Sequence, residues 1–250
     1  MADFPIMPTP GDPQDEKTSY KLPLKPIIVP LKDLVVFPTM IVSVYVRNSD
    51  LIKALDEAFR KQELIGLVSQ KSARQPVPPT DNLYEVGTSA TILQIIQGSK
   101  SGDAMVVVEA ISRFKVKKYV QERPYLIAEI EPVAASEKDN VKLQALAREV
   151  KELMRIAVTE GRQVAPEIIA SLSQIQNVDE IADIACSFLK LDVQKKQELL
   201  GEIDFEKRLK MVLDYLNTEI QLLKIKKKIH TDISHEINES EKKYMLRQEL

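Results

Sequence analysis

The apolar positions near the C-terminus follow the period of an α-helix. From Glu202 to Leu250 the chain contains neither glycine nor proline. A run of apolar residues at steps of three and four shares one helix face: Phe205, Leu209, Val212, Leu216, Ile220 and Leu223. At about 1.5 Å per residue, a helix over the whole stretch would be roughly 70 Å long. The pattern therefore predicts a long C-terminal helix that projects from the body of the protein.

A second apolar seam begins at Leu222. It follows an eleven-residue period, which gives a nearly straight or slightly right-handed seam, unlike that of a leucine zipper. Its positions are Leu222, Ile225, Ile229, Ile233, Ile237 and Tyr244. Because a lone projecting helix would leave this seam in contact with water, the pattern favours pairing with counterpart helices. We therefore expect these residues to mediate self-association, with the helix as an assembly strut.

Residues 23–135 have the β-branched content and the turn signals of a strand-rich region. The expected strands are Ile27–Val29, Ile41–Val46, Leu64–Ser69, Thr88–Gln97, Ala104–Val116 and Tyr125–Val133. A short helix capped by Asn48 or Ser49 is expected after the second strand, and Gln75–Asn82, with three prolines, is expected to be a stiff exposed loop. Six short strands and one helix predict a small, mostly antiparallel barrel or sandwich that protects its edges by closing.

Residues 136–201 change to helical periodicity. The expected helices are Val141–Thr159, one that begins at Pro166, one from Asn177 through Leu189, and one from Asp192 to Gly201. Residues 1–22 are rich in proline and polar residues, which predicts a disordered arm. The fold class is therefore α+β: a β-rich subdomain at 23–135, a helical subdomain at 136–201, and the long helix at 202–250.

Composition favours an ordinary globular protein over a nucleic-acid-binding or membrane protein. The chain is 44% apolar and 29% charged with a net charge of −2, which is ordinary for a globular protein and gives no attraction to nucleic acid. It has no apolar stretch long enough to span a membrane and no signal-peptide core at its N-terminus, so a cytoplasmic location is expected. The single cysteine, Cys186, lies among apolar residues and is expected to be buried.

The residues of the sequence give no evidence for a catalytic site. Gly98 and Gly102 are too close together for a phosphate-binding loop, and they lie between expected strands. His230 and His235 diverge around a helix, so they cannot share a metal ion, and no nucleophile–histidine pair is evident. The lysine run at 224–228 is either a solvated helix face or a contact for phosphates. We expect no enzymatic activity and no cofactor in this chain by itself.

Several motifs occur in a fixed order from Pro23 onward. They are Pro30–Pro38 (PLKDLVVFP), Leu67–Lys71 (LVSQK), Asp81–Gln94 (DNLYEVGTSATILQ), Val106–Arg113 (VVVEAISR), Lys196–Leu200 (KQELL), Arg208-Leu209 and Tyr244–Leu250 (YMLRQEL). In order and spacing they resemble the N-terminal region of the Lon family of ATP-dependent proteases. Lys32, Ser43 and Ala110 depart from the usual residues of that family, which affects local turn geometry.

The resemblance implies a PUA-like β domain followed by a helical subdomain. It also implies that the chain is a truncated part of a larger enzyme, with an AAA+ module and a Ser-Lys protease domain after Leu250. ATP and Mg²⁺ would then belong to that full-length parent. In the family, this region recognises unfolded or damaged proteins and degradation signals, and it helps to hold a homohexamer together.

Apolar residues in expected connections are the candidate substrate-binding residues. Phe37, Pro38 and Met40 follow the first motif, and Val77, Leu83 and Tyr84 flank the proline-rich loop. An exposed apolar patch there could hold unstructured chain segments, whereas the alternative is that these residues only cap the barrel. A purely structural stalk without substrate binding is the alternative function. RNA binding, known for other PUA-like folds, is disfavoured by the neutral charge of the β half.

Overall fold

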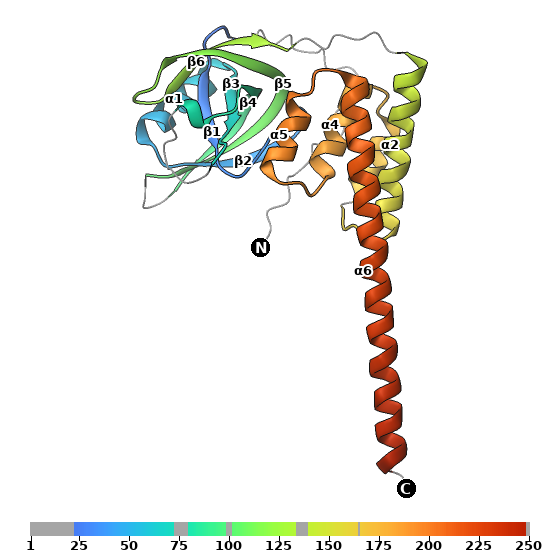
Figure 1. Ribbon diagram of the computed structural model, residues 1–250. Helices are drawn as coiled ribbons and strands as arrows, with labels where there is room; N and C mark the ends of the chain where they lie inside the picture. The colour runs from blue at the N-terminus through green and yellow to red at the C-terminus, as the bar shows by residue number, and fades with distance from the viewer. Residues whose placement is uncertain (1–22, 73–79, 99–101, 134–139, 165, 249–250) are drawn as a thin grey trace.

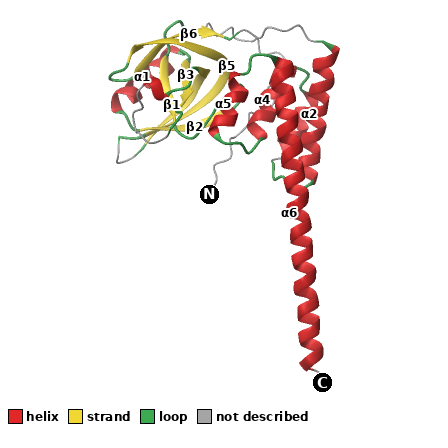
Figure 2. Ribbon diagram, viewed as in Figure 1, coloured by secondary structure: helices red, strands yellow, loops and turns green. Residues whose placement is uncertain are grey.

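Alternating apolar residues build six strands on one side of the molecule, and the helices that follow the last strand in the chain occupy the other side (Figure 1, Figure 2). The computed structural model describes residues 23–72, 80–98, 102–133, 140–164 and 166–248. The strands are β1 (Ile27–Leu31), β2 (Ile41–Val46), β3 (Ile65–Ser69), β4 (Val86–Gln97), β5 (Ala104–Gln121) and β6 (Leu126–Pro132). Helix α1 (Ser49–Lys61) follows β2, and a short 3₁₀ helix, η1 (Thr80–Asn82), precedes β4. The expected arm at 1–22 and most of the expected proline loop lie outside the described residues.

The length of β5 closes the sheet into a barrel. The strand order is β2-β5-β4-β3-β1-β6, and β5 also pairs with β6. The first part of β5 pairs with β2 through 104–109, and the second part pairs with β6 through 114–121. All pairings are antiparallel except β1–β3, which is parallel. Five strands thus form a closed ring, and β2 extends the sheet at one edge.

Strand β5 continues five residues beyond the expected end at Val116. The sequence there is rich in lysine, which hides the strand pattern. In the structure Lys117 and Lys118 pair with Glu131 and Glu129 of β6. Just before the extension, Lys115 pairs with Glu85, which directly precedes β4. Each pair is exposed and contributes little stability, so the extension depends on backbone pairing with β6.

Two glycines mark close approaches inside the barrel. At Gly87 a Cβ atom would lie 2.5 Å from the carbonyl oxygen of Leu67, and at Gly66 it would lie 2.5 Å from Cδ1 of Ile28. The oxygen belongs to the backbone of β3, so it cannot turn away as a side chain could. The barrel therefore requires a residue without a Cβ at position 87.

We expect Gly87→Ala to lower the free energy of unfolding by about 1–3 kcal/mol, because the added methyl group forces the paired strands β3 and β4 apart. Urea denaturation followed by far-UV circular dichroism measures the effect. Gly201→Ala is the matched control, since the nearest atom to its Cβ is 4.0 Å away, in ordinary van der Waals contact. Equal midpoints for the two variants would contradict this account of the barrel.

Several helices begin directly after the capping residues that were expected from the sequence. They are α2 (Val141–Thr159), α3 (Pro166–Gln174), α4 (Val178–Phe188), α5 (Val193–Gly201) and α6 (Phe205–Gln248). The Asn48, Asn177 and Asp192 side chains each accept hydrogen bonds from the first-turn N–H groups of α1, α4 and α5. Short polar side chains satisfy these otherwise unpaired donors, which fixes the helix starts locally.

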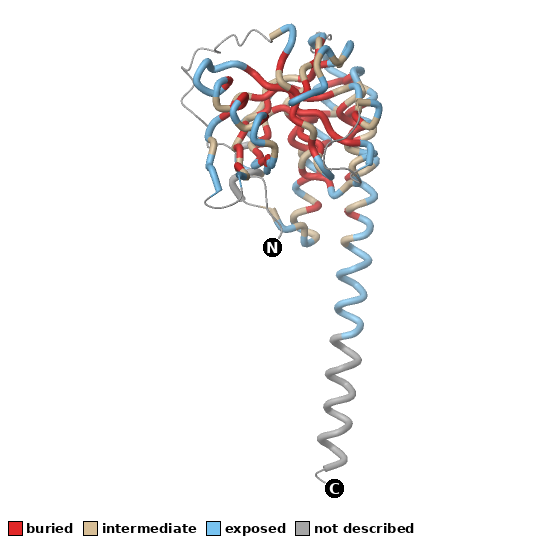
Figure 3. The backbone as a smooth tube through the Cα atoms, turned by 90° about the vertical axis from the view of Figure 1, so that its left-hand side faces the viewer, coloured by how far each residue is buried: buried red, intermediate tan, exposed pale blue. Residues whose placement is uncertain are grey.

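The core is continuous between the barrel and the helices. The larger apolar cluster includes Val108 of β5, Leu55 of α1, Ala185 of α4 and Leu209 of α6. A smaller cluster, which includes Phe114 and Ile130, fills the interior of the ring. Helix α6 packs against α2 and α4 and then continues beyond the body (Figure 1, Figure 3). Its 44 residues span roughly 65 Å, so the first half lies on the body and the second half leaves it.

Candidate functional site

The apolar residues expected to bind substrate are mostly buried. Phe37, Met40 and Leu83 are 0%, 5% and 3% exposed, Pro38 is buried, and Tyr84 is half-buried. The expectation that they form an exposed patch is therefore wrong for Phe37, Pro38, Met40 and Leu83, and Val77 lies outside the described residues. The reason is that the connection before β2 turns its side chains inward: Phe37 and Met40 join the large core cluster, and Leu83 joins the interior of the ring.

An exposed apolar surface lies instead on the outer face of β2, β5 and β4. Tyr45 of β2 is directly opposite Met105 of β5, and Met105 is directly opposite Ile96 of β4. Tyr45 is 69% exposed and Ile96 is 41% exposed, while Met105 between them is half-buried. These three residues form one row across the sheet, and we call it the outer row. Alternation in IVSVYV was the signal that could have identified Tyr45, since it places Tyr45 with Ser43 on the solvent face.

A groove begins at the end of the outer row. It has a volume of about 370 Å³ and lies between β1, β2, the start of α1 and the connection from β5 to β6. Tyr45 belongs to both the outer row and the groove. Most of the groove is lined by apolar or aromatic groups, among them Val29, Leu51 and Tyr125. The amide of Asn48 donates a 3.0 Å hydrogen bond to the carbonyl of Pro124 and so ties the two sides of the groove together.

Together the outer row and the groove offer a contiguous apolar surface with few charges. Exposed apolar patches of this kind on soluble proteins mark sites for other proteins or apolar ligands. No group of three or more histidine, cysteine, aspartate or glutamate side chains in the described part of the chain could hold a metal ion. Within the same residues, no helix has the length and apolar content to cross a membrane.

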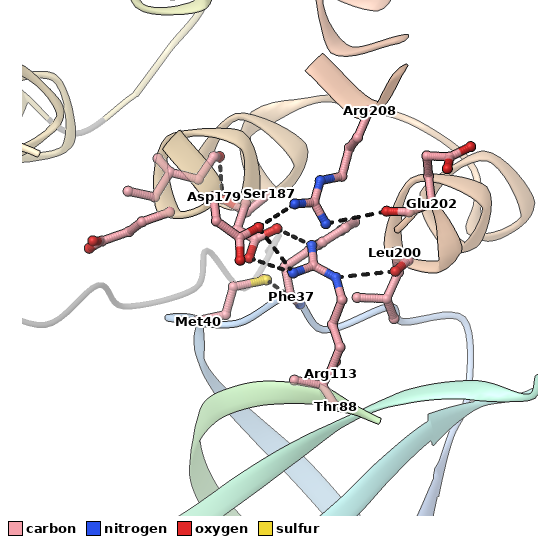
Figure 4. A network of polar contacts seen from close by, with 12 residues as sticks. Phe37, Met40, Thr88, Arg113, Asp179, Ser187, Leu200, Glu202 and Arg208 are labelled. Atoms are coloured by element: carbon pink, nitrogen blue, oxygen red, sulfur yellow. Dashed lines mark hydrogen bonds and ion pairs between the residues drawn. The ribbon is translucent and has the colours of Figure 1, made fainter. Parts of the chain in front are cut away.

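A buried ionic cluster joins the barrel to the helices (Figure 4). Arg113 of β5 donates a 3.0 Å hydrogen bond from Nη1 to Oδ2 of Asp183, and its Nη2 contacts the other carboxylate oxygen of that residue. The Nε of Arg113 donates to the carbonyl of Leu200 at 3.1 Å. From α6, Arg208 pairs with Asp179 of α4. Both arginines and Asp183 are almost completely buried, whereas the side chain of Asp179 is 28% exposed. One strand and two helices thus meet at four charges, three of which are shielded from water.

The ionisation of the cluster follows from burial and pairing. Burial raises the pKa of Asp183 to about 6, against the opposing effect of Arg113 and Arg208. Burial by itself would lower the pKa of Arg113, but the adjacent Asp183 carboxylate raises it, so the guanidinium stays charged. Asp183 is ionised above pH 7, and the cluster is then neutral overall. Its raised pKa means that Asp183 contributes stability at low pH, and this contribution is lost as the pH rises through 6.

The sequence did not reveal this cluster, although Arg113 ends the motif Val106–Arg113. An arginine at the end of a strand pattern normally faces solvent, whereas here groups of α4 and α5 bind the buried guanidinium. The sequence did place Cys186 correctly: it is fully buried. Burial also raises the pKa of its thiol to about 12, so the side chain serves packing rather than nucleophilic chemistry.

Comparisons with known proteins show which family this chain is similar to. The family profile described as the ATP-dependent protease La (LON) substrate-binding domain matches residues 26–218. A Lon protease of Clostridioides difficile is 37% identical over 241 residues, which cover 94% of this chain and 30% of that protein. A Lon protease of Brucella suis is 31% identical over 223 residues, covering 89% of this chain and 27% of that protein. The chain thus spans less than a third of the length of these relatives.

Solved structures show the same fold. The N-terminal domain of a Mycobacterium avium complex Lon protease superposes with a TM-score of 0.62 at 20% identity, over 77% of this chain and 98% of that one. The Lon N-terminal domain protein from Xanthomonas campestris gives a TM-score of 0.54 at 17% identity, over 76% of this chain and 98% of that one. The mixed α+β architecture is thereby confirmed. With the profile match over residues 26–218, these likenesses show that the chain belongs to the Lon protease family and contains its substrate-binding domain.

Proposed function

We propose that this chain captures unfolded segments of protein substrates for an ATP-dependent serine protease, and that it does so through the outer row and the adjoining groove. The observation that supports the site is the alignment of Tyr45, Met105 and Ile96 across three strands, with Tyr45 exposed beside an apolar groove. Apolar side chains are exposed in unfolded proteins and buried in folded ones. A surface of this kind therefore selects unfolded chains without reading a particular sequence.

The wider role follows from the family. In the full-length protein, an AAA+ module with ATP and Mg²⁺ and a Ser-Lys protease domain would act on what this domain binds. The substrates would be misfolded and short-lived regulatory proteins in the cytoplasm, degraded by a homohexamer. The closed ring of strands with β2 at one edge supports the PUA-like assignment. This chain would supply recognition, and the chemistry would lie elsewhere in the protein.

Fluorescence anisotropy tests the binding. A labelled, permanently unfolded and apolar-rich polypeptide is titrated with the chain, and a polar disordered polypeptide of the same length is the control. We expect saturable binding of the apolar-rich polypeptide alone, without ATP. Equal anisotropy changes for both polypeptides, or none for either up to the solubility limit of the chain, would contradict the proposed function.

A second candidate function is that of an assembly strut, and it is supported by the exposed side of α6. Leu222, Ile225, Ile229 and Ile233 are each more than half exposed, at 62%, 56%, 53% and 51%. They follow one another at steps of three and four along the helix, so they form one stripe. The side chains of Ile237 and Tyr244 lie outside the described residues. A stripe of large apolar residues on a projecting helix is stabilised when a second helix covers it.

We expect the chain to self-associate through this stripe at high micromolar concentration. Replacing Ile225 and Ile229 by serine should shift the sedimentation coefficient to that of a monomer, because each serine removes an apolar contact on both helices of a pair. Lys224→Ser with Lys228→Ser is the matched control on the same helix. A wild-type chain that stays monomeric throughout would leave α6 only the role of a connecting lever.

A further inference from the structure

Strand β2 is paired on one side only. Within the residues that the structure describes, every other strand has at least two neighbours, whereas β2 pairs with β5 alone. This pairing runs from Ile41 to Val46 without a register shift, in contrast to the bulged β4–β5 and β5–β6 pairings. Alternate N–H and C=O groups of an edge strand point away from its one neighbour. The outer edge of β2 is therefore a straight row of backbone donors and acceptors with no strand partner among the described residues (Figure 1).

This edge lacks the features that usually prevent a further strand from pairing. Proteins block exposed edges with charged side chains, prolines or bulges. The sequence of β2, IVSVYV, contains neither a charge nor a proline, and its residues favour extended backbone. An extended segment that lies along β2 would gain main-chain hydrogen bonds without removing a charged group from water. Among the described strands, closure of the ring therefore leaves the outer edge of β2 unpaired, in contrast to the expectation that the barrel protects its edges by closing.

The groove continues the same edge. It is lined by Tyr45 and Val46 of β2 and by Val29 and Pro30 of β1. Strand β1 pairs with β6 only through Ile27 and Ile28, so the rest of β1 leaves space beside β2. Side chains alternate between the two faces of a strand. A segment added to β2 would therefore place every second side chain towards the apolar lining of the groove.

Charges at the groove favour a neutral or basic occupant. Arg47 is paired with Asp103 at 3.8 Å. Glu122 accepts a 3.2 Å hydrogen bond from Thr80, and in the described part of the chain no cation forms an ion pair with it. An acidic segment would lie near this carboxylate and be repelled, whereas lysine or arginine would be attracted.

We propose that the outer edge of β2 takes up an extended segment of an unfolded polypeptide as an added strand. This inference rests on the proposed function and specifies which substrate segments bind and by which contacts. The segment is free of proline, neutral or basic, and has β-branched or aromatic side chains at every second position. Main-chain hydrogen bonds supply binding that does not depend on sequence, and the groove supplies specificity for the side chains.

Backbone methylation of a peptide tests this geometry. The probe is a labelled, acetylated and amidated hexapeptide with the sequence Thr-Val-Thr-Tyr-Thr-Val. One derivative is N-methylated on the three threonines and the other on the three apolar residues. Each derivative loses three N–H donors and keeps every side chain. Because alternate residues of a strand bond to a given neighbour, only one derivative loses the donors that face β2.

We expect the full chain to bind the unmodified hexapeptide, one derivative to bind at least tenfold more weakly, and the other to bind within about threefold of the unmodified peptide. Amide hydrogen exchange within Ile41–Val46 should also slow on binding. Equal affinities of the two derivatives, with the unmodified peptide bound, would overturn the added strand and leave the proposed function in place.

Two other outcomes are equally decisive. If the long apolar-rich polypeptide binds and the hexapeptide does not, the added strand is overturned and the proposed function stands. If neither binds, both the added strand and the proposed function are overturned. Protection of the β2 amides that rises with protein concentration in the absence of peptide would assign this edge to a second copy of the chain. That result would also overturn the proposal.

Discussion

Arg113→Met should lower the free energy of unfolding by about 3–5 kcal/mol, which corresponds to a fall in Tm of about 10 °C for a chain of this size. The guanidinium of Arg113 makes the paired contacts with Asp183 and the hydrogen bond to Leu200. Methionine fills much of the space but leaves the Asp183 carboxylate buried without its main partner. Differential scanning calorimetry at pH 8 measures the loss.

The loss should be smaller at pH 5 than at pH 8. Without Arg113, burial raises the pKa of Asp183 further, because one of the two opposing cations has gone. A carboxyl group with a raised folded-state pKa contributes stability at low pH that is lost as the pH rises. The protonated form of Asp183 therefore reduces the penalty in the acidic range.

Two controls distinguish the cluster from ordinary ion pairs. Arg155 pairs with Glu152 on the surface, where its side chain is 69% exposed, so Arg155→Met should change the stability by less than about 1 kcal/mol. The double variant Arg113→Met with Asp183→Leu should recover most of the loss, because no charge is left unpaired. A single Arg113→Met variant that melts within 2 °C of the wild type would show that the joint between barrel and helices does not depend on this cluster.

Replacing Tyr45 and Ile96 by serine should weaken the binding of an unfolded, apolar-rich polypeptide at least tenfold, equivalent to about 1.4 kcal/mol. Both side chains are exposed at the two ends of the outer row, so the substitutions remove binding surface with little loss of packing. Anisotropy titration gives the affinity. A Tm within about 3 °C of the wild type shows that the fold is kept.

Val141→Ser is the matched control for this pair. Val141 is 85% exposed and begins α2 in the helical half, away from the barrel strands. The substitution removes a highly exposed apolar side chain without touching the outer row or the groove. If Val141→Ser weakened binding as much as the double replacement, recognition would depend on general surface hydrophobicity, and the outer row would not be the binding site.

The helices and strands of this fold could be predicted where the sequence signals for them are local. The caps at Asn48, Asn177 and Asp192 gave the helix starts to within a residue, since a cap requires only its own first turn. Strand β2 and helix α2 were found with the expected bounds. The end of β5 was missed because its lysines mask the alternation, and its extension depends on β6, which comes later in the chain.

The candidate site could be predicted only in part, because burial is a property of the whole fold. The amino-acid sequence by itself determined the helix and strand segments and, through its motifs, the family, because these depend on neighbours within a few residues and on their order. Only the tertiary structure decided that Phe37 and Met40 turn into the core, that Arg113 is bound by groups of α4 and α5, and that β2 remains at an edge of the described sheet. These outcomes depend on which distant segments cover a side chain or pair with a strand, and the local pattern of apolar residues does not contain that information.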